Sequence, residues 1–103
     1  MNETNKALLA KENKKKLRVA HLPQVPCKPF HVEVETIEEA KKIFDVLANY
    51  DLFQFHNRIK PDYCNATFLQ TYNEEEGEWL DWDDDEYGMS EPDEYLAFLE
   101  EDE

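Results

Sequence analysis

The sequence predicts an α+β fold: a small antiparallel sheet of about three or four strands in β-α-β-β-β order, packed by one amphipathic helix and followed by a short C-terminal helix. Two patterns indicate this class. Residues 30–35 alternate apolar and polar side chains, as a strand with one buried face does. Residues 37–49 instead repeat apolar side chains at helical spacing, which predicts a helix that packs on the sheet.

The start of this helix is marked by a capping box. Thr36 opens the sequence Thr-Ile-Glu-Glu, in which the threonine side chain accepts a hydrogen bond from the amide of Glu39. After the helix, the alternating residues 52–55 predict a short strand. Residues 66–72, rich in threonine and aromatic residues, predict another strand, which pairs through the loop Asn-Glu-Glu-Glu-Gly with the sequence Glu-Trp-Leu-Asp-Trp.

The composition divides the rest of the chain into segments. Residues 1–29 are predicted to be a basic flexible arm and a proline-rich linker, because the arm shows no sustained apolar stripe. Residues 30–100 then form a single α+β domain that ends in an acidic hairpin and a helix with Pro92 in its first turn. Residues 101–103 are an acidic tail.

Charge is distributed very unevenly along the chain. The net charge is −14, yet residues 1–30 carry +5, whereas residues 73–103 carry sixteen acidic side chains and no basic one. A field of this sign repels nucleic acid and anionic membranes and attracts basic proteins. We therefore expect a protein partner, with no direct contact to nucleic acid or membrane.

Several classes of function find no support in the residues. Two cysteines, without a signal peptide or an apolar stretch of membrane-spanning length, favour a cytoplasmic protein with free thiols. No phosphate-binding loop or nucleophile motif is present, so we expect neither an enzyme nor a cofactor. Residues 83–94 resemble an EF-hand calcium loop in spacing, but Tyr87 stands where a ligand is needed, and we expect no metal site.

The strongest candidate site is the acidic and aromatic segment near the end of the chain. Residues 74–86 hold nine carboxylates, and two tryptophans stand among them three positions apart. On a regular strand these tryptophans would face opposite sides, which would leave one of them at the surface. The candidate partner-binding residues are Glu74, Glu75, Glu76, Glu78, Trp79, Asp81, Trp82, Asp83, Asp84, Asp85, Glu86 and Tyr87.

This segment suggests an acidic inhibitor that occupies the basic groove of a nucleic-acid-handling host protein, with carboxylates in place of phosphates. Duplex DNA presents one charge per ~1.7 Å of axis, which a folded acidic hairpin approaches within a factor of about two. Changing Asp83, Asp84 and Asp85 to Asn would then weaken binding and leave the fold intact. The alternative is an immunity-like or antitoxin-like inhibitor of one cognate toxin that binds through a shaped patch. An exposed hairpin edge would also allow a homodimer.

A further pattern connects the chain to bacteriophages. Residues 50–54 are Tyr-Asp-Leu-Phe-Gln, residues 59–66 are Ile-Lys-Pro-Asp-Tyr-Cys-Asn-Ala, and Glu78-Trp79 follow in an acidic context. This pattern resembles a type of small acidic protein encoded in phage genomes, although Thr67-Phe68 stand where that type has two glycines. The resemblance implies a phage setting and a host-directed role, and it implies no particular activity.

Overall fold

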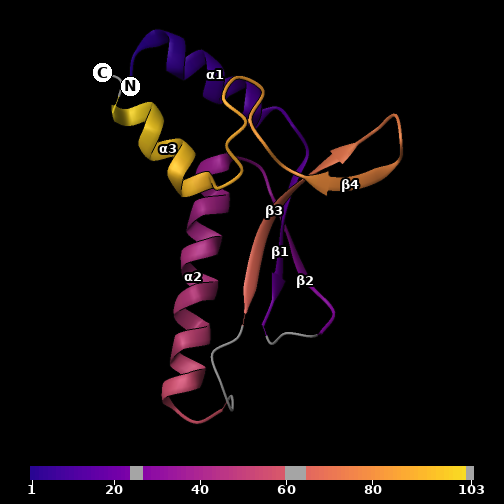
Figure 1. The fold of residues 1–103 in the computed structure, drawn as a ribbon, viewed down its shortest axis with the longest axis vertical. Coiled ribbons are helices and arrows are strands. Elements are labelled where there is room, and N and C mark those ends of the chain that lie inside the picture. The colour runs from indigo at the N-terminus through magenta and orange to yellow at the C-terminus, as the bar shows by residue number, and fades with distance from the viewer. Residues whose placement is uncertain (24–26, 60–64, 102–103) are drawn as a thin grey trace.

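The computed structural model describes residues 1–23, 27–59 and 65–101, which form an α+β fold and confirm the predicted class. In Figure 1, α1 and α3 lie at the end of the molecule where α2 begins, and the strands run beside α2. The elements in chain order are α1 (Glu3–Asn13), β1 (Leu17–Leu22), β2 (Phe30–Val34), α2 (Ile37–His56), β3 (Ala66–Asn73), β4 (Glu78–Asp81) and α3 (Pro92–Glu101).

The four strands lie in the order β2-β1-β3-β4, and each neighbouring pair is antiparallel. β1 lies inside the sheet, because Val19 is opposite Val32 of β2 on one side and opposite Leu69 of β3 on the other. This position corrects the prediction that the N-terminal part of residues 1–29 is a flexible arm, whereas residues 24–26 of the predicted linker lie outside the described residues. The apolar residues of β1 follow directly after a run of lysines. Because the segment as a whole is strongly basic, the short buried strand was not recognised from the sequence.

α1 was also missed, because it docks through polar contacts and has almost no apolar stripe. The side chain of Asn2 caps the helix by accepting a hydrogen bond from the amide of Asn5 at 2.7 Å. The buried Asn5 in turn donates from Nδ2 to the carbonyl oxygen of Leu99 in α3 at 3.0 Å. The described order is therefore α-β-β-α-β-β-α. The predicted β-α-β-β-β order is corrected at its N-terminal end, where α1 and β1 are added, and after α2, where two strands follow instead of three.

α2 begins as predicted, since Thr36 Oγ1 accepts a hydrogen bond from the amide of Glu39 at 3.0 Å. The helix continues to His56, so the strand predicted at residues 52–55 is wrong. The alternating pattern there arises because apolar side chains occupy both flanks of the helix, and several of them are exposed. Asn57 follows the last helical residue and caps the helix, with its Nδ2 donating to the carbonyl oxygen of Phe53 at 2.8 Å.

The C-terminal elements follow the prediction closely. β3 and β4 form the expected hairpin, and Gly77 ends its turn at a φ of 68°, where a side chain would be strained. α3 begins at Pro92, a position that needs no backbone N–H. The core lies between the sheet, α2 and the two terminal helices, and its buried residues are Leu9, Leu17, Val19, Val34, Ile37, Ala40, Leu69, Trp82, Tyr95 and Leu99.

A buried contact between a histidine and an aspartate joins α2 to the sheet outside this core. His21 Nε2 of β1 lies 2.7 Å from Asp51 Oδ2 of α2, and both side chains are almost fully buried. The other ring nitrogen, His21 Nδ1, lies 2.7 Å from Thr67 Oγ1 of β3. Three elements therefore meet at one imidazole. Its contacts with Asp51 and Thr67 must offset the free-energy cost of removing the ring from water.

We predict that Asp51→Ala lowers the free energy of unfolding by about 1–3 kcal/mol, because it leaves a nitrogen of a buried imidazole without its partner. The measurement is urea unfolding followed by tryptophan fluorescence. Asp45→Ala is the matched control in the same helix: Asp45 pairs with Lys41 at 2.8 Å on the surface, and its loss should cost at most about 1 kcal/mol. Equal losses in the two variants would contradict a special role for the buried pair.

Candidate functional site

The acidic hairpin is defined as β3, β4 and the turn between them. β3 starts beside α2, and the turn end of the hairpin extends away from α2 to the other side of the molecule (Figure 1). Its turn is held by short contacts: the amide of Gly77 donates to the carbonyl oxygen of Asn73 at 2.8 Å, and the amide of Glu76 donates to Asn73 Oδ1 at 3.1 Å. Its four glutamates, Glu74, Glu75, Glu76 and Glu78, are exposed. Within the described part of the chain, none of them forms an ion pair.

At the base of the hairpin, Trp79 is held by this chain's own side chains. Its ring lies 5.3 Å from the Tyr72 ring in an edge-to-face arrangement. The Arg18 guanidinium lies 4.3 Å from the centre of the Trp79 ring, and Lys16 Nζ lies 5.7 Å from it. These distances are in the range of cation–π attraction. Trp79 is thus half-buried at the surface, as the sequence predicted for one of the two tryptophans.

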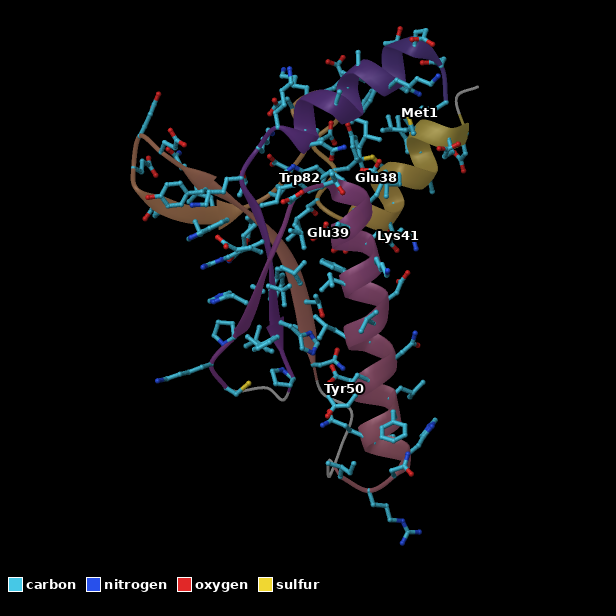
Figure 2. The ribbon with its side chains drawn as sticks, turned by 180° about the vertical axis from the view of Figure 1, so that it is seen from behind. Met1, Glu38, Glu39, Lys41, Tyr50 and Trp82 are labelled. Atoms are coloured by element: carbon cyan, nitrogen blue, oxygen red, sulfur yellow. The ribbon has the colours of Figure 1, made fainter. Side chains whose placement is uncertain are left out.

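Trp82, in contrast, belongs to the core, with 1% of its surface exposed. Its Nε1 donates to Glu12 Oε1 of α1 at 3.0 Å, and its ring lies 5.5 Å from the Tyr95 ring of α3. Figure 2 places it beneath α1 and beside the start of α2. Its predicted role in binding a partner is therefore corrected. The strand ends at Asp81, so the chain turns inward and Trp82 is covered by a helix that the sequence did not predict.

Glu12 also organises the acidic loop, defined as residues 82–89. Its Oε2 accepts a hydrogen bond from the amide of Asp85 at 3.0 Å, and Lys15 Nζ lies 2.7 Å from its Oε1. Lys15 and Lys11 both approach the Asp85 carboxylate, at 2.9 and 3.4 Å. The hydrogen bond from Lys15 lowers the pKa of Asp85 below its ordinary value. The basic N-terminal segment thus neutralises part of the acidic segment.

Asp84 is buried and builds the acidic loop from inside. Its Oδ1 accepts hydrogen bonds from the amides of Glu86 and Tyr87 at 3.0 and 2.6 Å, and its Oδ2 accepts one from the amide of Met89 at 2.6 Å. A carboxylate that satisfies three backbone donors is a structural element of the loop. Its predicted role at a binding surface is therefore also corrected.

The predicted site thus separates into three groups. Trp82 and Asp84 are buried, and Asp85 is paired with lysines. The exposed members are Glu74, Glu75, Glu76, Glu78, Asp81, Asp83, Glu86 and Tyr87, with Trp79 half-buried among them. Tyr87 packs against Phe98 of α3 with ring centres 4.8 Å apart, so it is anchored as well as exposed.

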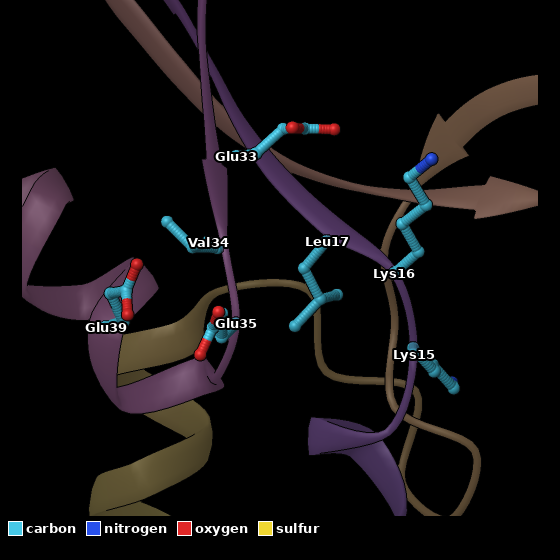
Figure 3. Close-up of a pocket in the computed structure, with 7 residues that line it drawn as sticks. All are labelled: Lys15, Lys16, Leu17, Glu33, Val34, Glu35 and Glu39. Atoms are coloured by element: carbon cyan, nitrogen blue, oxygen red, sulfur yellow. The ribbon is translucent and has the colours of Figure 1, made fainter.

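Two grooves flank the lysines that connect α1 to β1. Figure 3 shows one of them, lined by Lys15, Lys16, Leu17, Glu33, Val34, Glu35 and Glu39. The other lies between Lys14–Lys16 and the hairpin residues Glu74 and Glu75. Each groove is lined by both lysines and glutamates. The electrostatic potential in each groove is therefore mixed, whereas a site for a highly charged small ligand has a potential of one sign. Among the described residues, no three His, Cys, Asp or Glu side chains converge as metal ligands would.

With this geometry in hand, comparison with known proteins gives the setting. Residues 16–101 match the model of the family described as superinfection exclusion gene product 17. The chain belongs to this family. It is also 46% identical, over 97 aligned residues, to the superinfection exclusion protein of Salmonella phage P22, in an alignment that covers 84% of this chain and 94% of that protein. No solved structure shows a significant match.

Family membership confirms the resemblance to small phage-encoded proteins. The family description names exclusion and contains no reference to a DNA-like surface. In the described ranges, each helix is too short or too polar to cross a lipid bilayer.

We predict that Asp84→Ala destabilises the protein by about 1–3 kcal/mol, because three backbone N–H groups of the acidic loop lose their acceptor. The adjacent, exposed Asp83→Ala removes the same charge and should change stability by less than about 0.5 kcal/mol. Urea unfolding followed by tryptophan fluorescence measures both. A triple change of Asp83, Asp84 and Asp85 to Asn would accordingly damage the fold, contrary to the expectation from sequence. If Asp84→Ala were as stable as Asp83→Ala, the structural role of Asp84 would be refuted.

Proposed function

We propose that the chain acts in superinfection exclusion as a non-enzymatic binding protein in the host cytoplasm, which captures a basic, nucleic-acid-handling protein through its acidic hairpin. The observation that carries this proposal is the exposure of four hairpin glutamates, none paired within the described residues, on a hairpin that extends from the body. The negative charge of a carboxylate without an intramolecular ion pair is not neutralised by the protein, so it can attract the positively charged side chains of a partner. Membership of the exclusion family supports the setting in which such capture would be used.

Charge density supports a partner that ordinarily binds nucleic acid. The four glutamates occur within residues 74–78, at a turn that folds back on itself. At ~3.3 Å per strand residue, their spacing approaches the density of phosphates along a duplex. The same field makes direct binding of nucleic acid by the hairpin unfavourable. Binding of this kind depends on long-range attraction, so it weakens as salt is added.

The test compares two variants that each remove four negative charges from the net −14. One changes Glu74, Glu75, Glu76 and Glu78 to Gln. The matched control changes Glu91, Glu94, Glu100 and Glu101 to Gln, on and beside α3, where the side chains are also exposed. We predict that the hairpin variant loses exclusion by about tenfold or more, a loss of about 1.4 kcal/mol in binding, whereas the control keeps it.

Exclusion is measured as the plating efficiency of a superinfecting phage on cells that produce each variant at equal level. Both variants lack the same charge, so a difference between them reports the location of the charge rather than its sum. If the two variants excluded equally well, capture by the hairpin would be refuted.

A second candidate function is favoured by the aromatic and basic cluster at the base of the hairpin. Trp79, Tyr72 and Arg18 are the residue types that dominate binding energy at protein interfaces, and they lie together on the sheet face opposite α2. We infer from this cluster an immunity-like inhibitor that recognises one partner by shape. It predicts that exclusion survives the loss of the four hairpin glutamates and is lost by about tenfold or more with Trp79→Ala. Plating efficiency of the two variants side by side separates the candidates.

A further inference from the structure

β2 forms one edge of the sheet and carries two chemically distinct faces. In the described part of the chain it pairs with β1 alone, so the backbone groups on its other side have no strand partner. Val34 is buried against α2 and Val32 packs beside it, while His31 and Glu33 are exposed on the opposite face. Figure 3 shows Glu33 and Val34 pointing to opposite sides of the strand. An exposed edge of this kind is a ready template for another strand.

Large apolar side chains stand beside this edge with no cover from the described residues. Phe30, at the start of β2, is 59% exposed, and Val46, Tyr50 and Phe53 of α2 are 52%, 55% and 56% exposed. The three α2 residues follow helical spacing and share one flank, where the rings of Tyr50 and Phe53 stack at 6.5 Å. Phe30 and Tyr50 line the same pocket, so the flank and the edge adjoin. A contiguous apolar surface beside an open edge indicates an interface.

We propose that β2 pairs in antiparallel fashion with β2 of a second copy of this chain, around a two-fold axis at Val32. In this register His31 lies opposite Glu33 of the second copy, and Glu33 lies opposite its His31. An imidazole N–H donates to a carboxylate whether or not the ring is charged. On the other face, Phe30 lies opposite Val34. The strand is therefore complementary to itself in both charge and apolar character.

Neighbouring registers are less favourable. Opposite residues of an antiparallel pair lie on the same face, so the axis must pass through a residue if both copies keep their helices on one side. An axis at Glu33 would place two like carboxylates opposite each other, and an axis at His31 would leave Glu33 opposite Pro29. Charge thus selects the register centred on Val32.

The packing of α2 agrees with this arrangement. α2 lies over β1 and β2, so the two helices of a dimer would be separated by two to three strand spacings, about 10–14 Å. Helices with their side chains are about 10–12 Å across, so they meet without collision and their aromatic flanks fill the space between them. The acidic hairpin remains available, because β4 forms the other edge of the sheet.

Sedimentation velocity of the full chain over a micromolar concentration series tests the proposal. The parent is expected to sediment as a dimer at the upper end. His31→Glu places like carboxylates opposite each other at two positions of the interface and should raise the dissociation constant by about tenfold or more. The exchange His31→Glu with Glu33→His restores both opposite pairs and should restore the dimer. Both positions are exposed, so the fold should be unaffected, which circular dichroism verifies.

A variant on the other flank of α2 serves as the control for apolar surface. Leu52→Ser with Phe55→Ser removes two side chains that are each 40% exposed and should leave the dimer intact, whereas Tyr50→Ser with Phe53→Ser should weaken it. A monomer at every concentration would overturn the proposal. So would a dimer that His31→Glu leaves unchanged, or one that the double exchange fails to restore. None of these outcomes depends on exclusion, so they are independent of the role of the hairpin.

Discussion

The carboxylate of Glu12 joins the two oppositely charged ends of the chain. It accepts hydrogen bonds from the indole of Trp82 and from the backbone of Asp85, and it contacts the ammonium of Lys15. A buried carboxylate is tolerated only where donors and a countercharge surround it. Its position therefore couples α1 to the acidic loop. The oppositely charged ends of the sequence thus partly neutralise each other in the fold, and the four hairpin glutamates are among the exposed carboxylates that form no ion pair within the described residues.

The sequence predicted the elements whose signals are local. The capping threonine, the apolar stripe of α2, the hairpin turn at Gly77 and the proline that opens α3 each depend on neighbours within a few residues. It failed for α1 and β1, because their stability comes from distant partners. Asn5 is satisfied by Leu99 and Glu12 by Trp82, contacts that no periodicity in residues 1–20 reveals. A helix that is buried through polar residues lacks the apolar stripe by which a buried helix is recognised in a sequence.

The same distinction explains the candidate site. Counting carboxylates pointed to a segment whose hairpin glutamates are exposed, and the binding of a partner there stays a prediction. Counting could not distinguish Asp84, which satisfies backbone amides, from Asp83 beside it, which faces solvent. It also could not place Trp82, whose environment is set by α1. Residues of one type in one short segment therefore divide into structural and exposed members only once the fold is known.

The position of β1 at the centre of the sheet has a consequence for how the protein is made. Val19 pairs with Leu69, fifty positions later in the sequence, so the interior of the sheet closes only after Leu69 has been synthesised. Pairing over such a separation must first overcome the entropy of closing a long loop, which slows folding. A chain that has left the ribosome only as far as α2 has no partner for the inner side of β1 and exposes its apolar residues. Incomplete chains should therefore be targets for chaperones and proteases, and only the nearly complete chain acquires its protected form.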